Sequence, residues 1–307
     1  MRLIATILAS CFVAMASMSA QDASELVPAR QGIAVIGASA SAGWGVMVPV
    51  LEPSEGNRYR HVTLANALAA VDPTLPAVVT RSGDPLFFRQ RASERAAQVD
   101  LAIAAKPEAV IAVDFLFWYG YGTVRANTPS DAARMRMDRL ALGLAQIDRL
   151  AAENIPIIVG NLPDVSDAAD AMLYSVIGDA QLPRPDVLID LNNRIAQWAQ
   201  ANDQIHILPL STLINDMRGG KGVTAGGATW GPKPRLMQHD HLHPTDEGLL
   251  AVAASAVDRV RAAQGEPIPR PPVDKVAARL RLRQGDVAPQ GDTTMNTPPR
   301  STNTGAP

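Results

Sequence analysis

Three side chains near the two ends of the chain have the chemical types that acyl transfer needs. Asp240 stands three residues before His243 in an Asp-His-Leu-His-Pro segment, and Ser39 lies in a Gly-Ala-Ser-Ala-Ser-Ala-Gly segment that follows an apolar run. An aspartate at this spacing can hold an imidazole in one tautomer, so that the far ring nitrogen accepts a proton from a serine hydroxyl. The pattern predicts Ser39 as nucleophile, His243 as base and Asp240 as acid, with Ser41 as the rival nucleophile.

The C-terminal segment also permits a second interpretation, a metal site. Imidazole and carboxylate groups are zinc ligands, and four of them are clustered here. The clustered candidates are His239, Asp240, His241 and His243. Outside the cluster the chain has only His61 and His206 as further histidines. The serine mechanism, by contrast, needs no metal and no cofactor, and we expect none.

Composition and charge narrow the classes of partner. The chain has 307 residues, of which 47% are hydrophobic, and its formal net charge is -2. A globular protein with this balance has no electrostatic reason to bind nucleic acid or an anionic membrane surface. We expect a small molecule as its partner, and the sequence leaves the oligomeric state open.

Residues 1–20 have the layout of a secretory signal peptide. Arg2 precedes an apolar run, and small residues precede Gln21. We expect the leader to be removed and the mature protein to be secreted or periplasmic, without a membrane-spanning segment, because no later apolar run approaches the roughly 20 residues of a span. The alternative is a lipoprotein anchored through Cys11, the only cysteine of the chain. Once residues 1–20 are removed, the mature chain has no thiol, so the atom of its nucleophile must be oxygen.

Short β-rich segments alternate with longer segments of helical period. Strands are expected at 33–36, 77–80, 109–113, 155–159 and 205–208, and helices at 61–70, 92–105, 130–153, 187–201 and 246–264. The helix at 130–153 is expected to begin at Ser130 as N-cap and to bury Leu140, Leu144, Ile147 and Ala151 on one face. This alternation predicts one domain over residues 21–265, a parallel sheet with helices on both faces. Ligands of such sheets lie beyond the carboxyl ends of the strands, where Ser39 follows the first strand.

Two segments break this alternation. Residues 266–307 are rich in proline, glycine, threonine and asparagine, and we expect them to be a largely disordered tail. Residues 217–235 are rich in glycine and contain Trp230. We expect them to be a lid or substrate rim, or else a disordered excursion.

At these residues the chain resembles the GDSL or SGNH hydrolases, a superfamily of serine esterases and lipases. The resemblance covers three blocks, Gly37-Ala38-Ser39, Ser82-Gly83-Asp84 and Asp240-His241-Leu242-His243-Pro244. It implies a three-layer α/β/α fold of flavodoxin-like type with a five-stranded parallel sheet, and a triad of Ser39, Asp240 and His243. It further implies hydrolysis of carboxylic esters through an acyl-enzyme, with the oxyanion held by N–H groups of Ser39 and Gly83. The alternative is a non-catalytic envelope or carbohydrate-binding protein on the same fold.

The chain departs from the family pattern in two places. Ala38 stands where the family usually has an aspartate before the nucleophile. The block that normally supplies an oxyanion asparagine reads Val-Asp-Phe-Leu-Phe-Trp over residues 113–118. Loss of one oxyanion donor costs about 100- to 1000-fold in turnover elsewhere. Asn161, after the fourth strand, is the expected substitute donor, with a turn or capping role as its alternative.

Aromatic residues are concentrated where the active edge of the sheet is expected. The candidates for substrate contact are Trp44, Phe87, Phe117, Trp118 and Tyr119. Such rings form apolar acyl pockets or stacking platforms for sugar rings. We therefore expect a small-molecule or carbohydrate ester as substrate, and the alternative is that the rings merely plug the end of the sheet.

Overall fold

The structure, a computed structural model, describes residues 32–50, 59–83, 92–171, 177–231, 236–268 and 272–281. The expected leader with Cys11, the ring of Phe87 and residues 282–307 lie outside this description.

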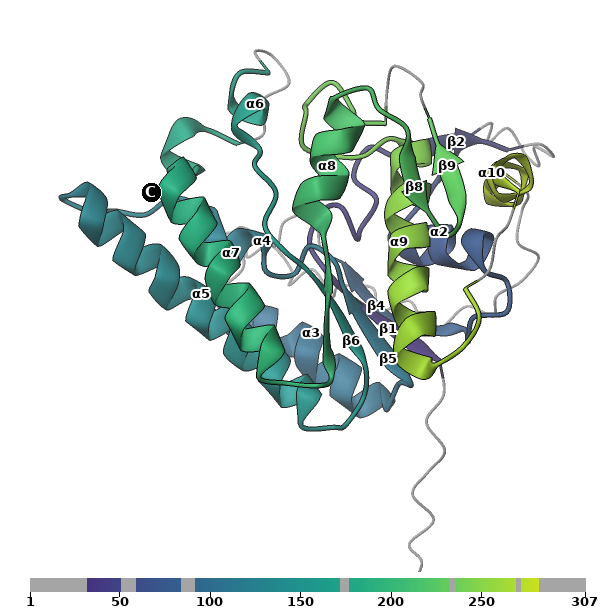
Figure 1. The fold of residues 1–307 in the computed structure, drawn as a ribbon, viewed down its shortest axis with the longest axis horizontal. Helices are drawn as coiled ribbons and strands as arrows, with labels where there is room; N and C mark the ends of the chain where they lie inside the picture. Colours follow the sequence, from purple (N-terminus) through teal and green to yellow (C-terminus); the bar gives the residue numbers. More distant parts are fainter. Residues whose placement is uncertain are drawn as a thin grey trace, which may run out of the picture.

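Five parallel strands form the central sheet in the order β4-β1-β5-β6-β7 (Figure 1). The strands are β1 (Ile33–Gly37), β4 (Val78–Gly83), β5 (Ala109–Ala112), β6 (Ile157–Gly160) and β7 (Ile205–Leu208). Counted along the chain within this sheet, the order is 2-1-3-4-5, the flavodoxin-like arrangement. The expected five-stranded parallel sheet is thereby confirmed. Its order reverses between β1 and β5, and ligands of open α/β sheets bind at such a switch point.

Helices cover both faces of the sheet (Figure 1). One face packs against α3 (Ala92–Ala105), α5 (Pro129–Ala151) and α7 (Pro185–Gln200), and the other against α2 (Leu64–Val71), α8 (Leu210–Arg218) and α9 (Asp246–Gln264). The connections contain the short helices α4 (Phe117–Gly120), α6 (Ser166–Ala169) and η3 (Asp179–Gln181). The three-layer α/β/α architecture is as expected. None of the helices in the described ranges is long and apolar enough to cross a membrane.

The ends of the two long helices show which local signals were decisive. Helix α9 has the expected bounds, Asp246–Gln264: the hydroxyl of Thr245 caps its start by accepting the N–H of Gly248, and Gly265, with φ +69°, caps its end. Helix α5 begins earlier than expected, because Thr128 rather than Ser130 caps it by accepting the N–H of Asp131. A proline in the first turn suits this earlier start. The expected core face of α5 is buried: Leu140, Leu144, Ile147 and Ala151.

The glycine-rich segment forms a packed hairpin of β8 (Val223–Ala225) and β9 (Ala228–Trp230). Gly226 and Gly227, with φ of +63° and +64°, make the two-residue turn that Gly-Gly favours. Trp230 is fully buried, and its indole N–H donates to the carbonyl of Ala225. The alternative of a disordered excursion is therefore wrong for the described part of this segment. A second hairpin that we did not expect joins β2 (Met47–Pro49) to β3 (Tyr59–His61).

The structure also differs from the expected disordered tail, because Val273–Arg281 is a helix, α10. Val276 and Leu280, four residues apart, are buried in the same core as α2 and α9. The guanidinium of Arg279 donates to the carbonyl of Ala70 at the end of α2. Two buried apolar side chains and the hydrogen bond from Arg279 thus dock this helix, although the overall composition of the segment is polar.

A buried ion pair joins the end of α2 to α9. The guanidinium of Arg261 lies 2.9 Å (Nε) and 2.7 Å (Nη2) from one carboxylate oxygen of Asp72, and also donates to Thr74. Burial raises the pKa of Asp72, but the hydrogen bonds from Thr74 and Arg261 outweigh it and hold the pKa below the ordinary value. The carboxylate is therefore ionised when the protein is folded.

Replacing Asp72 by alanine is expected to lower the free energy of unfolding by about 3 kcal/mol at pH 7, because the buried Arg261 loses its main counterion. Urea denaturation measures this change. The matched control is Asp100→Ala, which breaks an exposed ion pair with Arg149 and should cost less than about 1 kcal/mol. Because the folded pKa of Asp72 is lowered, its contribution is complete above the unfolded value of about 4 and is lost as pH falls through the folded value. The deficit of the variant should therefore shrink below about pH 4, and a deficit no larger than that of the control would contradict this role.

Candidate active site

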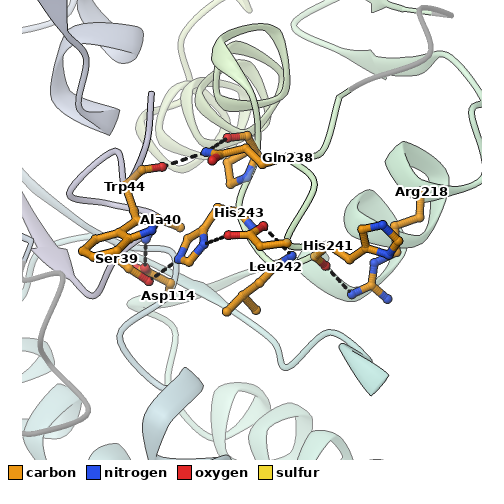
Figure 2. Close-up of polar contacts among 11 residues, drawn as sticks. Ser39, Ala40, Trp44, Asp114, Arg218, Gln238, His241, Leu242 and His243 are labelled. Carbon is orange, nitrogen blue, oxygen red and sulfur yellow. Dashed lines mark hydrogen bonds and ion pairs between the residues drawn. The ribbon is translucent and has the colours of Figure 1, made fainter. Parts of the chain in front are cut away.

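Ser39, His243 and Asp240 form one hydrogen-bonded chain, of which Figure 2 labels Ser39 and His243. The hydroxyl of Ser39 lies 2.7 Å from Nε2 of His243, and Nδ1 of His243 lies 2.6 Å from a carboxylate oxygen of Asp240. Ser39 lies two residues after the end of β1, whereas Asp240 and His243 lie in the loop before α9. The structure thus brings together three residues that we selected from the two ends of the sequence.

Asp240 holds both the imidazole and the backbone of its own loop. Its second carboxylate oxygen accepts the N–H groups of Leu242 and His243, each at 3.0 Å. Burial raises the pKa of Asp240, but the bond from the imidazole, with these N–H groups, holds it below the ordinary value. An ionised carboxylate only accepts hydrogen bonds, so Nδ1 of His243 donates to it and Nε2 is left to accept the proton of Ser39.

Two side chains fasten the loop that carries the base (Figure 2). The side-chain amide of Gln238 donates to the carbonyl of Trp44 at 2.7 Å. This bond ties the loop to residues 38–45, which carry the expected nucleophile Ser39 and are called the nucleophile loop below. Arg218, on α8, donates to the carbonyl of His241 at 2.9 Å. His241 has a φ of +56° and is exposed, so its backbone rather than its ring serves the loop. These contacts hold the two halves of the site in register.

Asp114, at the end of β5, contacts the nucleophile loop and was missed in the sequence. Its carboxylate accepts backbone N–H groups of that loop and, at 2.5 Å, the hydroxyl of Ser41. The hydroxyl of Ser41 is thus committed to Asp114, whereas that of Ser39 contacts the imidazole. The available signal was a carboxylate directly after the strand that borders the switch point.

The three expected oxyanion donors, Ser39, Gly83 and Asn161, have different surroundings in the structure. The backbone N–H of Ser39 donates to no acceptor among the described residues. Gly83 ends β4 beside this loop, and a Cβ there would lie 2.7 Å from the nitrogen of Ala42, so only glycine permits the approach. The amide of Asn161 both donates to and accepts from Ser211, each at 2.8 Å. Asn161 therefore fastens the end of β6 to the start of α8, which corresponds to the capping role that was its alternative. It does not line the cavity beside Ser39 that is described next.

An apolar cavity of about 40 Å³ opens beside the triad. It is lined by Ser39, His243, Phe117, Leu210, Leu242 and Val252, among others. A second, larger hollow of about 420 Å³ is lined by Trp44, His61, Thr63 and Gly83, with Ser41 shared between the two. The indole of Trp44 is 41% exposed, and its ring centre lies 6.0 Å from that of His243. The site therefore has one small apolar compartment and one large open compartment.

The expected aromatic residues divide between the site and the core. Phe117 lines the apolar cavity, and Trp44 lines the open hollow. Trp118 and Tyr119 line neither compartment and are buried with α5, where the ring of Tyr119 packs so close to Gly143 that a Cβ there would lie 2.7 Å from it. The interpretation of the rings as a plug for the sheet thus describes Trp118 and Tyr119.

The metal interpretation finds no support in the described part of the chain, where no three His, Cys, Asp or Glu side chains are grouped as metal ligands. Nε2 of His61 is hydrogen-bonded to the carbonyl of Gly43, and both ring nitrogens of His243 are engaged within the triad.

No protein-family model and no curated protein matches this sequence. Among solved structures the chain is similar to a GDSL-like lipase from Bacteroides thetaiotaomicron, with 16% identity over 76% of this chain and 89% of that chain and a TM-score of 0.43. It is also similar to a catalytic mutant of an acetylxylan esterase from Geobacillus stearothermophilus, with 16% identity over 79% of this chain and 97% of that chain and a TM-score of 0.45. The likeness to these structures is one of fold.

Proposed function

We propose that the protein hydrolyses carboxylic esters with Ser39 as nucleophile. The observation that carries the proposal is the chain of two short contacts from Ser39 through His243 to Asp240. Nε2 of His243 takes the hydroxyl proton as Ser39 attacks the carbonyl carbon, and then returns it to the departing alcohol. The N–H groups of Ser39 and Gly83 stabilise the oxyanion, and water hydrolyses the acyl-enzyme with His243 again as base. No cofactor is needed for these steps.

The sizes of the two compartments suggest how an ester lies in the site. A cavity needs about 10–15 Å³ for each water-sized occupant, so the 40 Å³ beside the triad suit an acyl group of about two to four heavy atoms. The open hollow beside Trp44 offers an exposed ring with His61 and Thr63, a surface that suits a polar alcohol such as a sugar. The proposed substrate is a short-chain acyl ester of a polar alcohol.

The acyl cavity predicts a steep dependence on chain length. For p-nitrophenyl esters, kcat/KM should be highest for acetate or propionate and should fall towards octanoate. Replacing Phe117 by alanine enlarges the cavity and should raise the octanoate-to-acetate ratio by roughly tenfold or more, because each buried methylene is worth about 0.8 kcal/mol at full effect. The matched control is Trp118→Ala, which removes a core ring and should lower the melting temperature without changing the ratio. An unchanged ratio in the Phe117 variant would place the acyl chain elsewhere.

Reaction with a fluorophosphonate probe tests the proposed function directly, because only an activated serine is labelled at a useful rate. Peptide mapping by mass spectrometry should locate the label on Ser39, and hydrolysis of p-nitrophenyl acetate should decline in step with labelling. A folded protein that neither reacts with the probe nor hydrolyses any ester of the series would contradict the proposal and favour the binding-protein alternative.

A further inference from the structure

The carboxylate of Asp114 gathers four hydrogen bonds from the nucleophile loop. It accepts the N–H groups of Ala38 (3.0 Å), Ala40 (2.8 Å) and Ser41 (3.1 Å), and the hydroxyl of Ser41 at 2.5 Å. The side chain is 6% exposed and lines the apolar cavity. No other side chain among the described residues makes as many bonds to this loop.

Ser39, the proposed nucleophile, is the one residue between Ala38 and Ser41 that donates no hydrogen bond to Asp114. The N–H groups before and after Ser39 point to the carboxylate, whereas that of Ser39 has no acceptor in the described ranges and its hydroxyl lies on His243. Because the N–H groups of the neighbouring residues all point to the carboxylate of Asp114, the N–H of Ser39 is turned away from that carboxylate. We propose that Asp114 is a positioning residue that presents the hydroxyl and the N–H of Ser39 together to the substrate. This inference rests on the proposed ester hydrolysis.

The backbone around Asp114 is shaped to admit this carboxylate. Gly37, with φ +157°, ends β1, and a Cβ on it would lie 2.1 Å from a carboxylate oxygen of Asp114. Ala38 is buried and brings no polar group of its own to the loop. Since β1 and β5 are neighbours in the sheet, a carboxylate at the end of β5 reaches a loop at the end of β1. Asp114 thus supplies from the neighbouring strand the acceptor that the loop lacks.

Only an acceptor on both oxygens satisfies four converging donors. Asparagine has the same shape, but its NH2 group would face at least one backbone N–H of the loop, because donors approach both oxygens of Asp114. Displacement of the nucleophile by about 1 Å costs on the order of 100-fold in rate. For Asp114→Asn we therefore expect kcat to fall about 100-fold with KM within about threefold, and labelling of Ser39 by the probe to slow to the same degree.

The matched control is Asp258→Asn, which alters a half-buried aspartate that accepts the N–H of Gly226 in the β8-β9 turn, away from the site. It should keep the kcat of the wild type even if its melting temperature drops. If Asp114 had a merely structural role, Asp114→Asn would behave in the same way, and this result would overturn the inference. A wild-type protein without activity or labelling would instead overturn the proposed function, so the two failures are distinguishable.

Should Asp114→Asn not fold, Ser41→Ala decides the question. This change removes one of the four donors and keeps the three N–H bonds to the carboxylate. We expect kcat to fall roughly threefold to tenfold at unchanged KM, since the loop is loosened rather than released. A kcat equal to that of the wild type would overturn the positioning role of Asp114.

Discussion

The Ser39→Ala variant is expected to lose ester hydrolysis by a factor of about 10⁴ or more in kcat, and to lose labelling by the fluorophosphonate probe entirely. Ser39 is half-buried and lines a cavity, and the change removes a single oxygen atom, so the melting temperature should stay close to that of the wild type. Steady-state kinetics with p-nitrophenyl acetate and a thermal melt measure both properties. The comparison variant, Ser41→Ala, should keep at least about a tenth of the activity, because its hydroxyl only supports Asp114. If Ser41→Ala abolished labelling while Ser39→Ala kept it, the nucleophile would be Ser41.

The second large effect is expected for Asp240→Asn, with kcat lower by about 10³- to 10⁴-fold and KM little changed. The amide NH2 of asparagine donates where the carboxylate accepts, so it favours the wrong tautomer of His243 and takes Nε2 out of use as a base. Because the pKa of Asp240 is held below its ordinary value, the wild-type carboxylate is ionised from about pH 4 upwards. The deficit of the variant should therefore persist across a kinetic profile from about pH 5 to pH 9.

A neighbouring histidine provides the control for this loop. His241→Asn should change kcat by less than about threefold, because the exposed ring of His241 has no part in the triad and asparagine tolerates its positive φ. A loss as large as that of Asp240→Asn would mean that the mutations act by disturbing the loop rather than the tautomer.

The elements with a strong local pattern could be predicted from the sequence. The strand Ile205–Leu208 and the helices Ala92–Ala105 and Asp246–Gln264 lie where they were expected, because hydrophobic period and end signals agree there. The elements that were missed depend on tertiary packing. Helix α10 has a polar composition and is held by two buried side chains, and β8 and β9 are too short for a period of two to stand out.

The site was predictable where its residues stand in a short motif or at the end of a predicted strand. Asp240 and His243 share one loop, and Ser39 follows the first strand, so motif and topology together selected them. Asp114 could not be identified as a partner of the nucleophile loop, because its role depends on the pairing of β1 with β5 and on the space that Gly37 leaves. Asn161 was assigned as a substitute oxyanion donor from its place after the fourth strand, because its contact with Ser211, 50 positions away, could not be read from the sequence.

The separation between the nucleophile and its base has a consequence for biosynthesis. Ser39 and His243 are 204 positions apart, and the last strand of the sheet ends at Leu208, before the loop that carries the base. Chains emerge from the ribosome with the N-terminal part first. A nascent chain can therefore complete every strand of the central sheet and still be chemically inert, because its proton acceptor has not been synthesised. The proposed hydrolytic site is complete only when α9, which follows the loop of the base, packs against α2. If the proposed function holds, the onset of activity marks this late step of folding rather than the formation of the sheet.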